Sequence, residues 1–340
     1  MKGVRVIFVH GISPSVITWD YSAALTQMIR SRLVNKGVIP VDATPDEVEQ
    51  IVSFDHVNYS GIGSDEETEL FAAYEAETKK LYNFVYRLSK VAGLDKVRRQ
   101  IITSISDVMV YESDYWRPII QGMVVDKIRP YVGTGDAVSL VAHSLGSVVT
   151  FDTIHENVHG NAEWAAAGFR PTNLFTMGSP LALFTLDLDH VTGQPNHRHK
   201  GSGEGEQLLE EGGVWYNFLD AQDIIAYPLE ILFETLFKIE DIVVQTGTNP
   251  RKAHDGYWQN DEVADVIAER LKMDYQRINT RPSEEEEEER ERIVVGSGYP
   301  EMGVAPPEEE TTTGDWMNML VDAAMEEVEE EVPDIPRTQN

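Results

Sequence analysis

Apolar and polar positions follow two periods along residues 1–280. Short runs rich in valine and isoleucine, such as VRVIFV at positions 4–9, have the length and composition of strands buried in a parallel sheet. The stretch after Trp19 instead repeats its apolar residues at helical spacing, and so do later stretches. The pattern predicts strands at 4–9, 51–59, 137–142, 172–177, 214–219 and 242–245, and helices at about 21–33, 145–158 and 261–273.

The order of these elements predicts the fold class. Strands that alternate with helices favour an α/β protein with a mostly parallel central sheet flanked by helices. The alternation is interrupted at about 65–132, where consecutive helical patterns follow one another without a strand. We therefore expect one domain over residues 1–279 with a helical insertion at about 65–132, placed to cover a substrate pocket.

Residues 280–340 differ in character from the rest of the chain. From Arg281 to Asn340 there are nineteen Asp and Glu residues against four Lys and Arg, which is half of the chain's net charge of −30. Such sequence buries too little apolar surface to order itself, so we expect a largely disordered acidic tail. Within it, apolar residues at helical spacing predict a short amphipathic helix at about 315–330, which could dock on the body or on a protein partner.

Composition excludes several function classes. The negative charge opposes binding to nucleic acid or to anionic membranes. The chain has no cysteine, so it forms neither disulfides nor thiolate metal sites. No apolar run is long enough to span a membrane, and the first apolar run resembles a strand more than a signal peptide. We expect a cytoplasmic protein. The apolar segment at 227–241 is interpreted as a core helix, with a lid that makes transient contact with lipid as the alternative.

Reactive residues gather where the predicted strands end. His10 and Gly11 follow the first strand, His143 and Ser144 follow the strand at 137–142, and Gly178 and Ser179 follow the next. The carboxyl ends of parallel strands meet at one edge of a sheet, where active sites form. Ser144 lies between a strand and a helix in Ala142-x-Ser144-x-Gly146, a variant of the nucleophile elbow in which small residues permit a sharp turn.

A serine hydroxyl needs a base, and the base needs an acid to orient it. His254 follows the last strand and is the predicted base. Asp223 is the predicted acid, because the apolar pair after it can hold it in place. Asp220 is the rival, with bracing of the turn as its other role. The order serine, aspartate, histidine is the order of an α/β-hydrolase.

An oxyanion hole is predicted beside this serine. The backbone N–H groups of Leu145 and Ile12 are the expected donors, and Gly11 allows the main chain to approach the substrate. We expect His10 to orient the oxyanion loop and His143 to be a packed elbow residue with no part in proton transfer.

The segments VIFVHGI, VAHSLGSVV, FTMGSPLALF, WYNFLDAQDIIAYP and HDGYW, in this order, resemble the lipase- and esterase-like branch of the α/β-hydrolase superfamily. The resemblance covers about residues 4–273. It departs from the family pattern at Ala142, which replaces the first elbow glycine, and at the helical insertion. It implies a serine esterase that forms an acyl-enzyme, without metal or organic cofactor, on a small-molecule or lipid-like ester.

Three alternatives stay open at this stage. Acyl transfer, or cleavage of a thioester or an amide, would use the same three residues. A bifunctional protein would use the acidic tail to recruit a partner. A metal site is conceivable in the loop after the fourth strand, although solvation explains the same residues: Asp187, Asp189, His190, His197 and His199.

Overall fold

A computed structural model describes residues 2–11, 21–59, 111, 115–182, 207–230 and 238–280. The predicted tail, the loop at 187–206 with its candidate metal ligands, and most of the predicted helical insertion lie outside these residues. The domain boundaries drawn from the sequence therefore stay predictions. Within the described residues, no group of three or more histidine and acidic side chains could hold a metal ion, and no helix is both long and apolar enough to cross a membrane.

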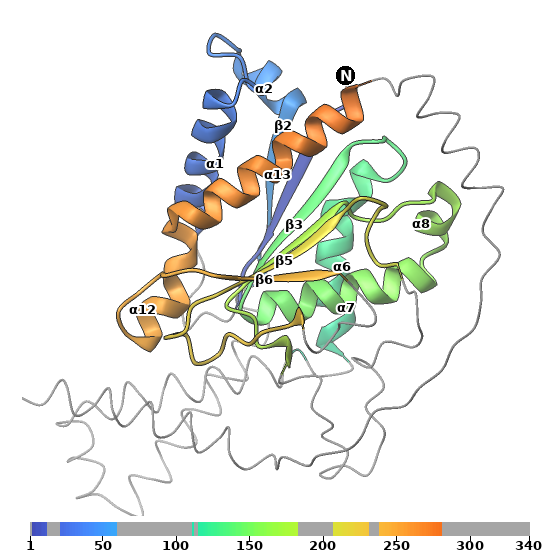
Figure 1. Ribbon diagram of the computed structural model, residues 1–340. Coiled ribbons are helices and arrows are strands. Elements are labelled where there is room, and N and C mark those ends of the chain that lie inside the picture. The colour runs from blue at the N-terminus through green and yellow to red at the C-terminus, as the bar shows by residue number, and fades with distance from the viewer. Residues whose placement is uncertain are drawn as a thin grey trace, which may run out of the picture.

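Six strands among the described residues form one sheet in which every neighbouring pair is parallel, in the order β2-β1-β3-β4-β5-β6 (Figure 1). The strands are β1 (Val4–Val9), β2 (Val52–Val57), β3 (Ala137–His143), β4 (Asn173–Met177), β5 (Val214–Leu219) and β6 (Ile239–Val243). The α/β fold class predicted from the sequence is confirmed.

The strand order contains one switch of direction. The chain passes from β1 to the edge strand β2, and then crosses back to place β3 on the other side of β1. Crossovers on the two sides of such a point leave a crevice at the carboxyl ends of the strands. The ends of β1 and β3, where His10 and Ser144 lie, flank this point.

Helices cover both faces of the sheet (Figure 1). The helices of the described residues are α1 (Ala23–Asn35), α2 (Pro45–Ile51), α6 (Trp116–Ile128), α7 (Leu145–Gly160), α8 (Ala162–Ala167), α12 (Pro250–Asp255) and α13 (Asp261–Asn279), with short 3-10 turns η1 (Arg129–Tyr131) and η2 (Gly256–Gln259). Helices α1 and α13 pack together on one face, and α6 and α7 pack together on the other.

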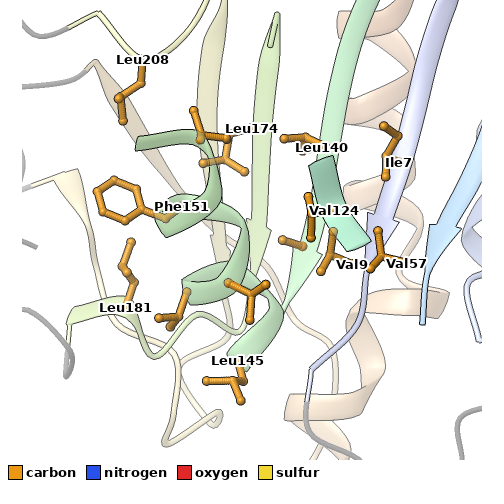
Figure 2. Packing of buried hydrophobic residues seen from close by; sticks show 14 of the residues in the cluster. Ile7, Val9, Val57, Val124, Leu140, Leu145, Phe151, Leu174, Leu181 and Leu208 are labelled. Atoms are coloured by element: carbon orange, nitrogen blue, oxygen red, sulfur yellow. The ribbon is translucent and has the colours of Figure 1, made fainter. Parts of the chain in front are cut away.

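Alternation along each strand divides the core into two layers. On β1, Ile7 and Val9 join the layer beneath α6 and α7, whereas Val6 and Phe8 join the layer beneath α1 and α13. Figure 2 shows the first layer, in which Phe151 of α7 packs over the sheet among aliphatic side chains. Burial of each large apolar side chain contributes about 1.5–3 kcal/mol. These two layers hold the strand ends that carry the candidate site.

Several element boundaries differ from the predictions. Helix α13 continues six residues past Met273, because Tyr275 and Ile278 still pack against the core and Asn279 bonds to the backbone of Lys2. Helix α2 was not predicted, although Thr44 and Glu47 form a capping box at its start.

The core helix predicted at 227–241 is wrong at its end. Strand β6 begins at Ile239, so residues 239–241 belong to a strand rather than to a core helix. Its Asp241 carboxylate accepts hydrogen bonds from Asn217 Nδ2 and from the backbone N–H groups of Leu229 and Glu230. These contacts tie the start of the segment to the sheet. Residues 231–237 lie outside the description, so the lid alternative stays untested.

Candidate active site

Ser144 lies at a strained turn between β3 and α7. Its φ of 53° and ψ of −133° make it the one residue other than glycine with positive φ in the part of the chain that the structure describes. A non-glycine residue in such a region costs of the order of 1–3 kcal/mol, so the surroundings must hold it there. The Ser144 N–H donates to Met177 O at 3.0 Å, and the Ser144 carbonyl accepts from the N–H and the hydroxyl of Ser147.

Two glycines make room for this turn. A Cβ atom on Gly11 would lie 2.3 Å from the Ser144 Cβ, and one on Gly146 would lie 2.2 Å from the His10 carbonyl oxygen. Real Cβ atoms do not approach other atoms so closely, so neither position accepts a side chain without movement of the elbow. Ala142 replaces the first elbow glycine without conflict, since it lies inside the layer of core residues beneath α7.

We expect Gly146→Ala to destabilise the fold by about 2–3 kcal/mol, because the new methyl group must push α7 away from the end of β1. Urea unfolding measures this loss. Gly160→Ala at the other end of α7 is the matched control: a Cβ there meets nothing within 4 Å, and alanine is the better helix former. Equal stability of the two variants would contradict the tight contact between α7 and β1.

The predicted base and acid both lie beside Ser144. His254 Nε2 is 2.9 Å from Ser144 Oγ, and His254 Nδ1 is 2.9 Å from Asp223 Oδ2. His254 comes from α12 and Asp223 from the turn after β5, so three separate strand-end connections supply the three side chains. The Asp223 side chain is fully buried, whereas 17% of the His254 side chain is exposed. The structure thus brings together the three residues predicted from the sequence.

Asp223 is held as a carboxylate. Its Oδ1 accepts from the Ile225 N–H at 3.0 Å, and its Oδ2 accepts from the Tyr257 hydroxyl at 3.0 Å. Burial raises the pKa of Asp223, but the hydrogen bond from His254 and these two donors outweigh burial, and its pKa lies below the ordinary value. The acid is therefore charged whenever the base needs a partner.

This depressed pKa predicts a pH-dependent contribution to stability. The ionised Asp223 stabilises the fold fully above its unfolded pKa of about 3.9, and the contribution is lost as the pH falls through the lower folded pKa. We expect the difference in unfolding free energy between the wild type and Asp223→Asn to shrink between pH 6 and pH 3. A difference that stays constant over this range would show that Asp223 is not selectively stabilised in its charged form.

Asp220 braces the loop instead of reaching the base. Its carboxylate accepts hydrogen bonds from Gln222 N, Thr246 N, Thr246 Oγ1 and Gly247 N. Burial raises the pKa of Asp220, but these donors outweigh it and hold the pKa below its ordinary value. The bracing role that the sequence left as the alternative for Asp220 agrees with these contacts.

Sequence reasoning missed Tyr257, and it placed Gly178 at a strand end without assigning it a role. The Tyr257 hydroxyl accepts from the Asp220 N–H at 2.8 Å while it donates to Asp223, so it links the two acidic residues. Gly178 has a φ of 57°, and a Cβ there would lie 2.8 Å from Asp223 Oδ2 and 3.1 Å from His254 Nδ1. Tyr257 lies within HDGYW, one of the segments that carry the family resemblance, but this segment did not indicate its contacts with the two acidic residues.

His10 directly precedes Gly11, where the predicted oxyanion loop begins. Its Nδ1–H donates to the Gly11 carbonyl at 2.6 Å, and its Nε2 accepts from the Tyr59 N–H at 3.2 Å. Burial lowers the pKa of His10, in keeping with a neutral ring that uses one nitrogen as donor and the other as acceptor. Ile12, one expected oxyanion donor, lies outside the described residues. Leu145, the other, is the first residue of α7, so its N–H has no partner one turn back in the helix.

His143 faces the base from the end of β3. Its Nε2 lies 2.7 Å from the His254 carbonyl oxygen, and the centroids of the two imidazole rings are 4.7 Å apart. His143 is buried, with 7% of the residue exposed, and the rings of Tyr257 and Trp258 lie next to it. The prediction that His143 is packed in the elbow agrees with this burial.

The arrangement can activate a hydroxyl. A neutral histidine at hydrogen-bond distance from Ser144 can remove its proton, and the carboxylate on the far nitrogen fixes the tautomer and stabilises the imidazolium that results. The start of α7 directs unpaired N–H groups and the positive end of a helix dipole toward the same place, where a developing oxyanion would be stabilised.

Comparisons with known proteins give weak structural similarities. Neither the protein-family models nor the curated proteins match this chain. A fungal esterase from Rhizomucor miehei is 11% identical, with 82% of this chain and 77% of that chain covered and a TM-score of 0.39. The RedJ thioesterase of prodiginine biosynthesis from Streptomyces coelicolor is 12% identical, with 80% and 86% covered and a TM-score of 0.37. A cutinase-like protein from Cryptococcus sp. is 8% identical, with 80% and 94% covered and a TM-score of 0.34.

The assignment of the fold rests on the chain itself. The described sheet is wholly parallel, with its switch point between β1 and β3, and a positive-φ serine follows β3 at the start of a helix. The serine, the aspartate and the histidine then follow in this order, each after a strand. The chain has the α/β-hydrolase fold.

Proposed function

We propose that the protein is a serine hydrolase that cleaves carboxylic esters through an acyl-enzyme intermediate. The observation that carries the proposal is the continuous line of hydrogen bonds from Asp223 through His254 to Ser144, with 2.9 Å at each of its two links. Ser144 is the proposed nucleophile, His254 the general base and Asp223 the orienting acid. The mechanism requires neither a metal nor an organic cofactor.

In the first half of the reaction, Ser144 Oγ attacks the ester carbonyl while its proton moves to His254 Nε2. The carbonyl oxygen becomes an oxyanion, for which Leu145 N–H and Ile12 N–H are the proposed donors. His254 then gives its proton to the leaving alcohol as the carbon–oxygen bond breaks. The acyl group remains on Ser144, and Asp223 has stabilised the charged imidazole throughout.

In the second half, water takes the place of the alcohol. His254 removes a proton from the water, whose oxygen attacks the acyl carbon, and the second oxyanion collapses with release of the carboxylic acid. The proton returns from His254 to Ser144 Oγ, which restores the resting state. A thioester or an amide would follow the same steps, and an alcohol in place of water would make the enzyme an acyltransferase.

We propose an apolar or lipid-like acyl group. The acidic chain disfavours anionic substrates, since its net charge is −30. Ile224, directly after the proposed acid, leaves 38% of its surface exposed and offers an apolar contact next to the site. Most of the helical insertion and the segment at 231–237 lie outside the described residues.

A substrate panel tests this proposal. We expect purified protein to hydrolyse p-nitrophenyl esters with a burst of one p-nitrophenol per active site, because p-nitrophenol is a good leaving group and acylation is then faster than the release of the acid by water. The rates with butyrate, octanoate and palmitate esters show which acyl-chain length the enzyme prefers. A matched thioester and anilide test the leaving group, and added alcohols test acyl transfer. Absence of a burst and of turnover with every ester would refute ester hydrolysis, and a faster thioester would change the assigned substrate class.

A further inference from the structure

The mechanism above leaves one buried titratable group next to the nucleophile without a role. His143 Nε2 lies 2.7 Å from the carbonyl oxygen of His254. A carbonyl oxygen only accepts hydrogen bonds, so the Nε2 of His143 must carry the proton and donate it. The residue immediately before the proposed nucleophile is thus bonded to the main chain of the proposed base, 111 positions later in the sequence.

The backbone of His254 needs such support. Helix α12 has only six residues, and the carbonyl groups in the last turn of a helix have no partner within it. Side chains from two other strand ends approach these carbonyls. Thr246 Oγ1, which follows β6, lies 2.6 Å from Ala253 O, and His143, at the end of β3, donates to His254 O.

We propose that His143 is a positioning residue, which holds the His254 carbonyl so that the imidazole of His254 stays in line with Ser144. This inference rests on the proposed function. Because β3 supports both Ser144 and His143, the same strand end fixes the nucleophile and the main chain of its base. A displacement of about 1 Å between reacting groups costs about 10²-fold in rate, so a single hydrogen bond at this place has a large effect.

The neutral state of the His143 ring suits this role. Burial lowers the pKa of His143 to about 3, with smaller contributions in the same direction from His254 and His10. The hydrogen bond to His254 O and the carboxylate of Asp223 raise this pKa, but they do not outweigh burial. A neutral donor can therefore remain beside His254 when that residue takes up the proton from Ser144. A lysine or arginine would also donate to the carbonyl, but its charge would oppose formation of the second cation.

Two substitutions of His143 separate the effect of its hydrogen bond on kcat from the effect of the volume of its ring. His143→Leu introduces an apolar side chain of similar size and removes the donor, whereas the amide of His143→Gln can still donate to His254 O. We expect the leucine variant to lose about 10- to 100-fold in kcat with KM changed less than about twofold. The glutamine variant should recover to within about threefold of the wild type. Wild-type kcat in the leucine variant, or equal losses in both variants, would overturn the proposal.

A direct observation of the ring covers the case in which the leucine variant does not fold. NMR of wild-type protein labelled with ¹⁵N-histidine reports which nitrogen carries hydrogen. We expect His143 as the neutral Nε2–H tautomer throughout pH 5–8. The Nδ1–H tautomer or an imidazolium in this range would overturn the inference. Failure of a fluorophosphonate to react with Ser144 of the wild type would instead count against the proposed function, so the two failures are distinguishable.

Discussion

Replacing Ser144 by alanine is expected to lower kcat for p-nitrophenyl ester hydrolysis by about 10⁵-fold or more, because no other group can form the acyl-enzyme. The loss should leave the fold intact. The Ser144 side chain makes one hydrogen bond to His254, while its backbone bonds to Met177 and Ser147 do not depend on the hydroxyl. Steady-state kinetics and active-site titration with an ester burst measure the effect.

Ser139→Ala is the matched control for this loss. Ser139 lies on β3, the strand that ends directly before Ser144, is fully buried, and uses its hydroxyl to accept a hydrogen bond from Asn173. We expect this variant to lose about 1 kcal/mol of stability and to keep its kcat within about threefold. Turnover by Ser144→Ala above about 1% of the wild-type rate would contradict the role of Ser144 as the nucleophile.

The second large effect is expected at Asp223. Asp223→Asn keeps the size of the side chain and removes the charge that steadies His254, and its amide N–H₂ can force the imidazole into the wrong tautomer. A loss of about 10⁴-fold in kcat is expected on this ground. An amide has one oxygen, so it can keep the bond from Ile225 N–H or the bond from the Tyr257 hydroxyl, but not both. Because the size of the side chain is unchanged, we still expect the variant to fold. Thermal unfolding and the kinetics of ester hydrolysis are the measurements.

Asp220→Asn provides the contrast, because it changes the other acid on the same turn. Oδ2 of Asp220 accepts hydrogen bonds from Thr246 N, Thr246 Oγ1 and Gly247 N, which an asparagine in the same place cannot satisfy equally. We expect a loss of about 2–3 kcal/mol in stability and less than about tenfold in kcat. A greater loss of kcat in Asp220→Asn than in Asp223→Asn would show that Asp220, and not Asp223, is the acid that orients His254.

The sequence was most informative where local patterns and tertiary structure agree. Strands β1 and β5 occur at the predicted residues, because a short run of apolar, β-branched or aromatic residues bounded by polar ones has few other stable conformations. Strand β6 was placed three residues too late, since Glu240 and Asp241 interrupt its apolar pattern at the edge of the sheet. Asp241 is held by Asn217 of β5 and by the backbone N–H groups of Leu229 and Glu230, and no local pattern reveals these partners.

The residues of the candidate site were likewise predicted where a local pattern carried the information. Ser144, Asp223 and His254 could be found because parallel strands bring their carboxyl ends to one edge, whatever the distance along the chain. Tyr257, Gly178 and the contact of His143 with the His254 carbonyl could not, because each depends on the exact approach of two connections. The choice of Asp223 over Asp220 was argued from the apolar pair after Asp223, whereas the observed contact is a hydrogen bond from the backbone N–H of Ile225, which does not depend on an apolar side chain.

The position of a covalent adduct tests the central proposal most directly. Wild-type protein treated with a fluorophosphonate should gain the mass of one phosphonyl group, and digestion should place it on the peptide that contains Ser144. The group forms when Ser144 Oγ displaces fluoride from phosphorus, with His254 as the base. The account predicts complete modification of the wild type and none of Ser144→Ala. An adduct on another residue, or an equal adduct on Ser144→Ala, would contradict it.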